Sequence, residues 1–228
     1  PCITSRSKRR LDCYAKRSRE VEARCVARFD RDTDPSLPDL VDIDDDLEPI
    51  LRDRISAKRV KHSVAVASLA EALAIQHGLD ADGARRAGLL HDLWREEGFG
   101  CIPEATRRGI TLPEWADGNP VMLHGSLAAA EAAERFGLSN AWCDAIAFHT
   151  TGRHGMTPED LVIYLADHTC AGRKGPNVAS LRELAFKDLE LAACQMIDEL
   201  VLSLVAAGAL LWLPSAEARN DLLVRTRL

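Results

Sequence analysis

After residue 47, apolar side chains recur every three or four positions, and this spacing persists almost to the end of the chain. Residues 59–77 are the clearest case, because their valines, alanines and leucines share one helix face and Gly78 can end the helix. No stretch alternates apolar and polar residues as a half-buried strand would. The pattern therefore predicts an all-α fold, a compact helical bundle of roughly seven to nine helices.

Capping residues place several helix boundaries. Asp80 is a typical N-cap for a helix over residues 81–94, and Thr157 followed by Pro158 is a typical start for a helix that runs to about residue 168. Further helices are expected over residues 103–108, 125–136, 140–148, 178–207 (which one break can interrupt) and 214–225.

The beginning of the chain differs from the rest in charge. Residues 1–31 contain ten Lys or Arg against four Asp or Glu, whereas residues 32–50 contain eight acids and no Lys or Arg. Such blocks, with prolines among the acids, are typical of an extension and a linker. We therefore expect residues 1–46 to be a poorly ordered extension, basic and then acidic, and residues 47–228 to be one helical domain.

Composition argues against several classes of protein. The seven cysteines are odd in number and form no C-x-x-C pair, so neither a disulfide framework nor a cysteine-rich zinc site is expected, and a reducing cytoplasm is the simple inference. The longest apolar run, residues 201–213, is shorter than the ~18 residues of a membrane span. The basic arm could touch nucleic acid, but the net charge is −6 and no aromatic or fold motif accompanies the arm. Neither a membrane nor nucleic acid is therefore expected as a partner.

Several polar residues lie in sequence surroundings that predict burial. The residues are His62, His91, His124, His149 and Asp167. For any one histidine, a core or helix-end role is the more common explanation than a metal ligand. A buried carboxylate, however, needs a cation or several hydrogen-bond donors.

Helix lengths bring two of these histidines together. The helices over residues 59–77 and 81–94 are joined by a short turn, so they should be antiparallel neighbours. At 1.5 Å per residue, His62 and His91 then lie near the same end of the hairpin, within about one or two turns. Asp92 points about 100° away from His91 on an ideal helix, so the two residues can serve different metals. The same reasoning does not bring His149 near Asp167.

With Asp92 added, the candidate set contains four imidazoles and two carboxylates. Such a set suits Fe, Mn, Co or Zn better than Ca or Mg. Six side chains are too many for one catalytic ion with an open position. They suit two ions bridged by one aspartate and a water-derived hydroxide, an arrangement that can act on phosphate esters and anhydrides by in-line displacement.

The ordered motifs resemble a known family. RVKHSVAVASLAEALAIQHGLD, RRAGLLHDLWRE, MLHGSLAAA and AIAFHTTGRHGMTPEDLVIYLAD are similar to the HD superfamily of metal-dependent phosphohydrolases, and within it to the YqeK-type symmetrical diadenosine tetraphosphate (Ap4A) hydrolases. The similarity covers roughly residues 47–226, so residues 47–228 are expected to be an HD-type domain.

This resemblance implies a dinuclear site, usually of iron, with Mn, Co and Zn as alternatives. His62, His91, Asp92 and Asp167 would hold one ion, and His124 and His149 the other, with Asp92 as the bridge. The implied reaction is hydrolysis of Ap4A to two ADP by a hydroxide that the two metals activate, with Asp92 and Arg95 as catalytic residues.

Residues around the expected site are candidates for binding the dinucleoside polyphosphate. They are Arg95, Thr150, Thr151, Gly152, Arg153 and Arg173. Arg95 stands where the family usually has Lys, and Trp94 is bulkier than the family's usual residue, which leaves another nucleotide open as substrate. A non-catalytic nucleotide- or nucleic-acid-binding module is the other alternative, and a homodimer is compatible with the sequence.

Overall fold

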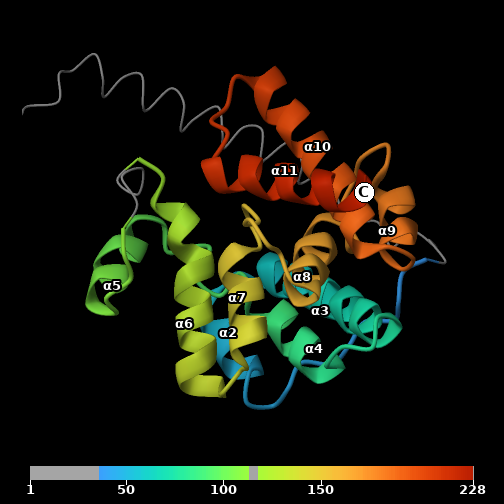
Figure 1. Cartoon of the computed structure of the whole chain (residues 1–228). Helices are drawn as coiled ribbons and strands as arrows, with labels where there is room; N and C mark the ends of the chain where they lie inside the picture. Colours follow the sequence, from blue (N-terminus) through green and yellow to red (C-terminus); the bar gives the residue numbers. More distant parts are fainter. Residues whose placement is uncertain (1–35, 113–117, 228) are drawn as a thin grey trace, which may run out of the picture.

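The computed structural model describes residues 36–112 and 118–227, and within these ranges it is built of α-helices and short 3-10 turns with no strand (Figure 1). This confirms the predicted all-α class. The elements are α2 (Glu48–Arg54), α3 (Ala57–Gln76), α4 (Ala81–Leu90), η1 (Gly98–Gly100), α5 (Cys101–Arg107), η2 (Pro120–Leu123), α6 (His124–Phe136), α7 (Asn140–Phe148), α8 (Pro158–Thr169), α9 (Val178–Ala185), α10 (Leu189–Ala207) and α11 (Leu213–Arg227).

The ten α-helices of the described ranges exceed the predicted seven to nine. One reason is α2, whose seven residues are too short for a hydrophobic period to be recognised. The other is a definite break between α9 and α10, where the Asp188 side chain accepts a hydrogen bond from the Leu191 N–H and starts a new helix.

Predicted capping residues act as expected. The Asp80 side chain accepts from the Gly83 N–H at the start of α4. Thr157 and Asp160 form a reciprocal capping box at the start of α8. Gly78, which follows the C-cap of α3, has a φ of 71°, a conformation that glycine adopts without a steric penalty.

The prediction for the second helix was wrong at its end. α4 stops at Leu90 rather than at Trp94, and a series of turns follows. In these turns the Leu93 N–H donates to the Leu90 carbonyl and the Arg95 N–H to the Asp92 carbonyl, a spacing of three residues instead of four. His91 and Asp92 therefore lie at the end of the helix, where the backbone tightens.

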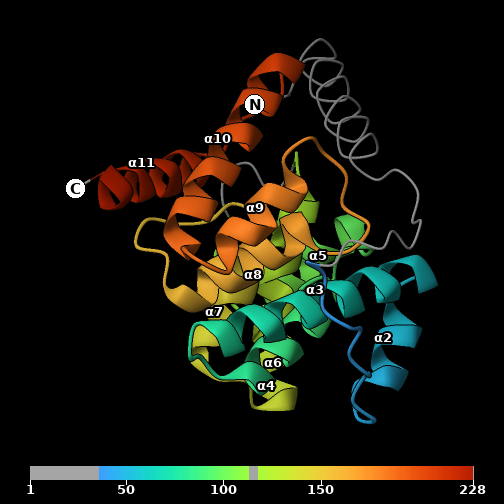
Figure 2. The same ribbon diagram turned by 90° about the vertical axis from the view of Figure 1, so that its right-hand side faces the viewer.

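Close packing of small residues holds α3 against α4. A Cβ atom on Gly88 would lie only 2.5 Å from the Ala67 Cα and 2.8 Å from the Ala67 N, so the two helices approach more closely than a side chain there would allow. α8 packs against α3 and α4, and α7 lies between α6 and α8 (Figures 1 and 2). These helices carry the buried core.

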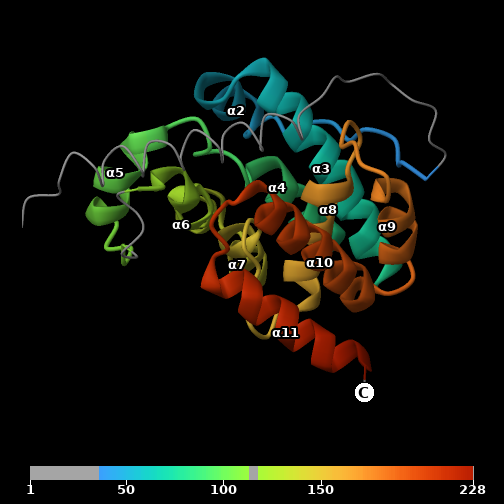
Figure 3. The same cartoon turned by 90° about the horizontal axis from the view of Figure 1, so that it is seen from above.

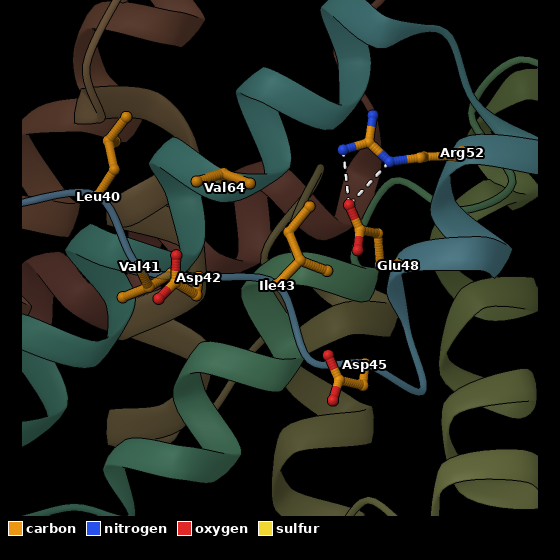
Figure 4. Close-up of a pocket in the computed structure, with 8 residues that line it drawn as sticks. All are labelled: Leu40, Val41, Asp42, Ile43, Asp45, Glu48, Arg52 and Val64. Atoms are coloured by element: carbon orange, nitrogen blue, oxygen red, sulfur yellow. Dashed lines mark hydrogen bonds and ion pairs between the residues drawn. The ribbon is translucent and has the colours of Figure 1, made fainter.

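Residues 36–46, which we predicted to belong to the extension, lie along α3 and α4 and are held there by polar contacts. The Val41 N–H donates to the Ser68 hydroxyl at 3.0 Å, and Arg85 and Arg86 both pair with Asp44. A hollow lined by this segment, α2 and Val64 of α3 contains none of the predicted site residues (Figure 4). Residues 1–35 lie outside the described residues.

α10 and α11 lie on the outer side of α8, and α9 lies beside α10 (Figure 3). α10 packs against α8, α9 and α11. Within the described residues no helix is both long and apolar enough to cross a membrane.

Candidate metal centre

The six residues predicted as metal ligands converge on one place. His62 comes from α3, His91 and Asp92 from the end of α4, His124 from the first position of α6, His149 from the C-cap of α7 and Asp167 from the last turn of α8. The rings of His62 and His91 lie 5.3 Å apart, centre to centre, as the hairpin geometry predicted. His91 is also 5.0 Å from His149, an approach that the sequence could not establish.

Asp92 lies at the centre of this cluster, with its two oxygens facing opposite sides. Its Oδ2 is 3.4 Å from the His91 Nε2 and 3.8 Å from the His62 Nε2. Its Oδ1 is 3.3 Å from the His124 Nε2 and 3.9 Å from the His149 Nε2. The carboxylate thus presents one oxygen to each pair of imidazoles.

Asp167 completes one side of the cluster. Its Oδ1 lies 2.9 Å from the His62 Nε2 and 3.9 Å from the His91 Nε2. Two groups of side chains can gather ligand atoms closely enough to hold an ion: His62, His91 and Asp167, and His91, Asp92 and His149.

Backbone carbonyls orient three of the imidazoles. The Nδ1 atoms of His91, His124 and His149 bond the carbonyls three residues earlier, those of Gly88, Val121 and Ile146, at 2.7, 2.5 and 2.7 Å. Because a carbonyl only accepts, each Nδ1 must carry the proton, and each Nε2 lone pair is directed into the cluster. This is the tautomer that a metal ligand needs.

A buried nitrogen atom without a partner also indicates that these side chains suit a metal ion. The His91 Nε2 is buried and has no hydrogen-bond partner, an arrangement that costs free energy unless something else binds the atom. A cation shared with the two carboxylates would satisfy it. Imidazole nitrogens combined with carboxylate oxygens are ligands that transition metals accept.

Burial keeps most of the imidazoles neutral. Desolvation lowers the pKa of His62 and of His124 from the usual 6.5, against the opposing effect of the nearby aspartates. Desolvation and the charge of His124 together lower the pKa of His149 to about 3. His91 differs from the other histidines. Burial alone would lower the pKa of His91, but the charge of Asp92 outweighs the effect of burial, so the pKa is raised overall from 6.5.

Both carboxylates remain charged. Burial alone would raise their pKa values, but the charge of His91 holds the pKa of Asp92 well below its usual range, and the charge of Arg173 does the same for Asp167. The ionised carboxylates and the neutral rings of His62, His124 and His149 are in the protonation states that bind metal ions, whereas His91 would release its Nε2 proton on binding one.

Two arginines contact these carboxylates. Arg173, a predicted phosphate contact, bonds the Asp167 carboxylate through Nη2 and the Asp167 carbonyl through Nε at 2.6 Å. Arg59 donates from Nη1 to the Asp92 Oδ2 at 2.7 Å, and sequence reasoning missed it. The available signal was its position three residues before His62, which places both side chains on one helix face.

The other predicted substrate contacts lie at differing distances from the ligands. The charge of Arg95 lowers the pKa of His124, so this guanidinium is close to the cluster. The Thr150 Oγ1 lies 3.3 Å from the His149 Nε2, whereas the Thr151 hydroxyl donates to the Gly152 carbonyl. These threonines belong to the loop that directly follows a ligand.

The structure does not bring Arg153 to the ligands. Its guanidinium pairs with Asp160 at 2.9 Å and with Asp144 at 3.0 Å and lies over the Phe148 ring. Gly152 is buried with a φ of 66°, and a Cβ there would lie 3.0 Å from the Ala218 Cβ of α11. These contacts fix the path of the loop after His149.

Trp94 is buried beside the cluster rather than exposed to a substrate. Its indole N–H donates to the Glu131 Oε2 at 2.8 Å, and the Arg54 guanidinium lies 4.2 Å from the ring centre. Glu131 also pairs with Arg54 and Arg135. The bulky indole therefore joins the turn after Asp92 to α6 and α2.

The chain is similar to several known proteins. A family model described as the HD domain matches residues 59–172. The chain is 30% identical over 138 residues to the symmetrical bis(5'-nucleosyl)-tetraphosphatase of Staphylococcus aureus, covering 60% of this chain and 71% of that protein. It is also 30% identical over 156 residues to the enzyme of the same name from Bacillus subtilis, covering 68% of this chain and 84% of that protein.

A solved structure is also similar. It is a protein of Clostridium acetobutylicum described as a predicted HD superfamily hydrolase involved in NAD metabolism. The TM-score is 0.75 and the sequence identity 33%, and the match covers 79% of this chain and 97% of that chain.

Proposed function

This chain belongs to the HD domain family, and from that membership we propose that it is a metal-dependent hydrolase that cleaves diadenosine tetraphosphate symmetrically into two molecules of ADP. The observation that carries the proposal is the central position of Asp92, whose two oxygens face two separate pairs of imidazoles. The names of the curated relatives support the choice of substrate.

The side chains of this protein would hold two ions in the way that the resemblance implies. His62, His91 and Asp167 surround one place, His124 and His149 border the other, and Asp92 lies between them. Two such ions, when bound, would activate water and neutralise phosphate oxygens. The family and the donor set support metal dependence, and we propose iron as the metal, with Mn, Co and Zn as the alternatives.

The chain also supplies cations for a highly charged substrate. Arg59 and Arg173 reach the two carboxylates with about a quarter of each side chain exposed, and Arg95 lies close enough to affect His124. Guanidinium groups bind phosphate oxygens through two parallel hydrogen bonds. We assign phosphate binding to these three arginines, whereas Arg153 supports the loop that carries Thr150 and Thr151.

The setting of the enzyme in the cell is part of the same proposal. The four cysteines of the described residues are unpaired and buried, which fits a reducing compartment such as the cytoplasm. A homodimer remains a prediction that sedimentation of the full chain would test.

Product analysis tests the proposed reaction. Metal-loaded protein is incubated with Ap4A, and the nucleotides are separated by chromatography. ADP should be the only product, and Asp92→Asn should abolish its formation, whereas the matched control Asp198→Asn, on α10 in a surface ion pair with Arg219, should not. Formation of ATP and AMP would disprove symmetrical cleavage. Turnover of a nucleoside monophosphate in preference to Ap4A would favour the alternative substrate class.

A further inference from the structure

One of the four imidazoles in the cluster lacks the backbone contact that orients the others. The Nδ1 atoms of His91, His124 and His149 bond backbone carbonyls at 2.7, 2.5 and 2.7 Å. The Nδ1 of His62 has a different partner, the Sγ of Cys170 at 3.8 Å, and no other hydrogen-bond partner among the described residues. The orientation of this ring therefore depends on a sulfur atom rather than on the backbone.

Cys170 is held in place by the end of a helix. It is the C-cap of α8, its side chain is completely buried, and it follows Asp167 by three residues, so the two side chains lie on one face of the last turn. The Sγ lies 3.8 Å from the carbonyl oxygen of Asp167. Because a carbonyl only accepts, the thiol directs its proton to that oxygen, and the sulfur lone pairs remain available for the N–H of His62.

The other nitrogen of His62 faces the place where an ion would lie. Its Nε2 is 2.9 Å from the Asp167 Oδ1 and 3.8 Å from the Asp92 Oδ2. The ring of His91 lies 5.3 Å away, and its buried Nε2 has no hydrogen-bond partner, which independently indicates a cation at this place. An ion bound at the Nε2 of His62 requires the ring proton on Nδ1, and that N–H then needs an acceptor.

We propose that Cys170 is a positioning residue for the metal centre: its sulfur accepts the Nδ1–H of His62 and so directs the Nε2 lone pair of that ring to the ion shared with Asp167. This inference rests on the proposed metal-dependent function and concerns how firmly the ion is held, not which substrate is cleaved. A thiol sulfur is a weak acceptor, whereas a carboxylate makes a metal-binding imidazole more basic. The residue at position 170 should therefore set the affinity for this ion.

Cobalt(II) titration of the metal-free full chain, in competition with a chelator, measures that affinity. Cys170→Ala removes the acceptor and should weaken the binding of one of the two ions by roughly tenfold. The matched control is Cys194→Ala, which removes another buried thiol, on α10, and should leave both affinities unchanged. Calorimetry of the two variants gives the stability lost with each thiol. If Cys170→Ala loses stability but binds both ions as tightly as the unchanged protein, then Cys170 only fills space and the proposal is overturned.

A variant with a stronger acceptor should change the affinity in the opposite direction. Cys170→Asp offers a carboxylate to the Nδ1–H of His62 and should bind the ion at least as tightly as the unchanged protein, hence at least tenfold more tightly than Cys170→Ala. A role in packing alone predicts the reverse, since a buried carboxylate fits the space less well than a methyl group. Ala171→Asp adds the same charge one residue further along the chain and should tighten binding less. An equal gain in Ala171→Asp would assign the effect to charge alone and contradict the proposal.

The absorption spectrum of the cobalt-loaded protein shows whether Cys170 binds the ion itself. A thiolate bound to cobalt gives a charge-transfer band in the near ultraviolet, and the unchanged protein should lack this band. A band that disappears in Cys170→Ala would make Cys170 a ligand and overturn its role as a positioning residue. If the unchanged protein binds no cobalt, the metal-dependent function fails together with this role, whereas two ions bound with the same affinity in every variant would refute the role of Cys170 alone.

Discussion

Gly88→Ala should separate α3 from α4 and loosen the ligand cluster. The added Cβ would lie 2.5 Å from the Ala67 Cα and 2.8 Å from the Ala67 N, whereas carbon atoms in contact prefer about 3.5–4.0 Å. Both nearest atoms belong to the backbone, so no side chain can rotate away, and the helices must move apart by about 1 Å. His62 is on one of these helices, and the Gly88 carbonyl accepts the hydrogen bond from the His91 Nδ1.

The size of the effect follows from two opposing contributions. Overpacking costs about 1–3 kcal/mol, and alanine gains about 1 kcal/mol over glycine in a helix. Because the added Cβ meets backbone atoms, the cost should lie in the upper part of that range, about 2–3 kcal/mol, so that the net loss is about 1–2 kcal/mol. This loss lowers the melting temperature by about 2–8 °C in a domain of this size. Urea unfolding and calorimetry measure the loss, and elemental analysis should show less metal per chain.

Gly100→Ala is the matched control, since the nearest atom that its Cβ would meet is the flexible end of the Glu97 side chain at 3.4 Å. Its stability and metal content should match those of the unchanged protein. If Gly88→Ala is as stable as the unchanged protein and keeps all of its metal, then close contact between α3 and α4 does not position the ligands.

Three further outcomes are expected. Arg59→Ala should lower kcat/KM for Ap4A by roughly tenfold to a hundredfold, as expected for the loss of one charge-assisted hydrogen bond, and should leave the metal content unchanged. Arg59→Lys should recover part of the lost kcat/KM. An unchanged kcat/KM in Arg59→Ala would show that Arg59 does not bind phosphate. Burial would raise the pKa of Glu131, but hydrogen bonds from Arg135 and Trp94 lower this pKa overall from the usual 4.5. The ionised carboxylate therefore contributes stability above pH 4.5, and this contribution is lost as the pH falls through the lower pKa of the folded state. Glu131→Gln should therefore be less stable at neutral pH and lose less stability on acidification in urea titrations between about pH 6 and 3; parallel curves would contradict this. Burial raises the pKa of Cys101 to about 11 and that of Cys170 to about 12, so iodoacetamide at pH 8 should label both only after unfolding, and rapid labelling of the folded protein would refute their burial.

Local features of the sequence predicted much of the fold. Asp80 and Thr157 are short-range capping signals, and both act as predicted. The approach of His62 to His91 also followed from local information, because a short turn and two helix lengths determine it. The end of α4 did not follow, since the change to hydrogen bonds three residues apart after Leu90 leaves no signal in the spacing of the apolar residues.

Contacts between distant helices could not be derived from the sequence. His149 meets His91 because α7 and α8 both pack on α4, and no spacing along the chain encodes that arrangement. Arg153 illustrates the same limit, because a basic residue next to the ligand loop is equally suited to phosphate or to the acids of α7 and α8, and here it pairs with Asp144 and Asp160.

The most direct test of a two-metal hydrolase centred on Asp92 is the number of transition-metal ions per chain in the purified full-length protein. The unchanged protein should contain about two ions per chain, as a dinuclear site requires, and Asp92→Asn should contain fewer than one because both positions share that carboxylate. A single ion in the unchanged protein, or two ions retained in Asp92→Asn, would contradict the bridging role of Asp92.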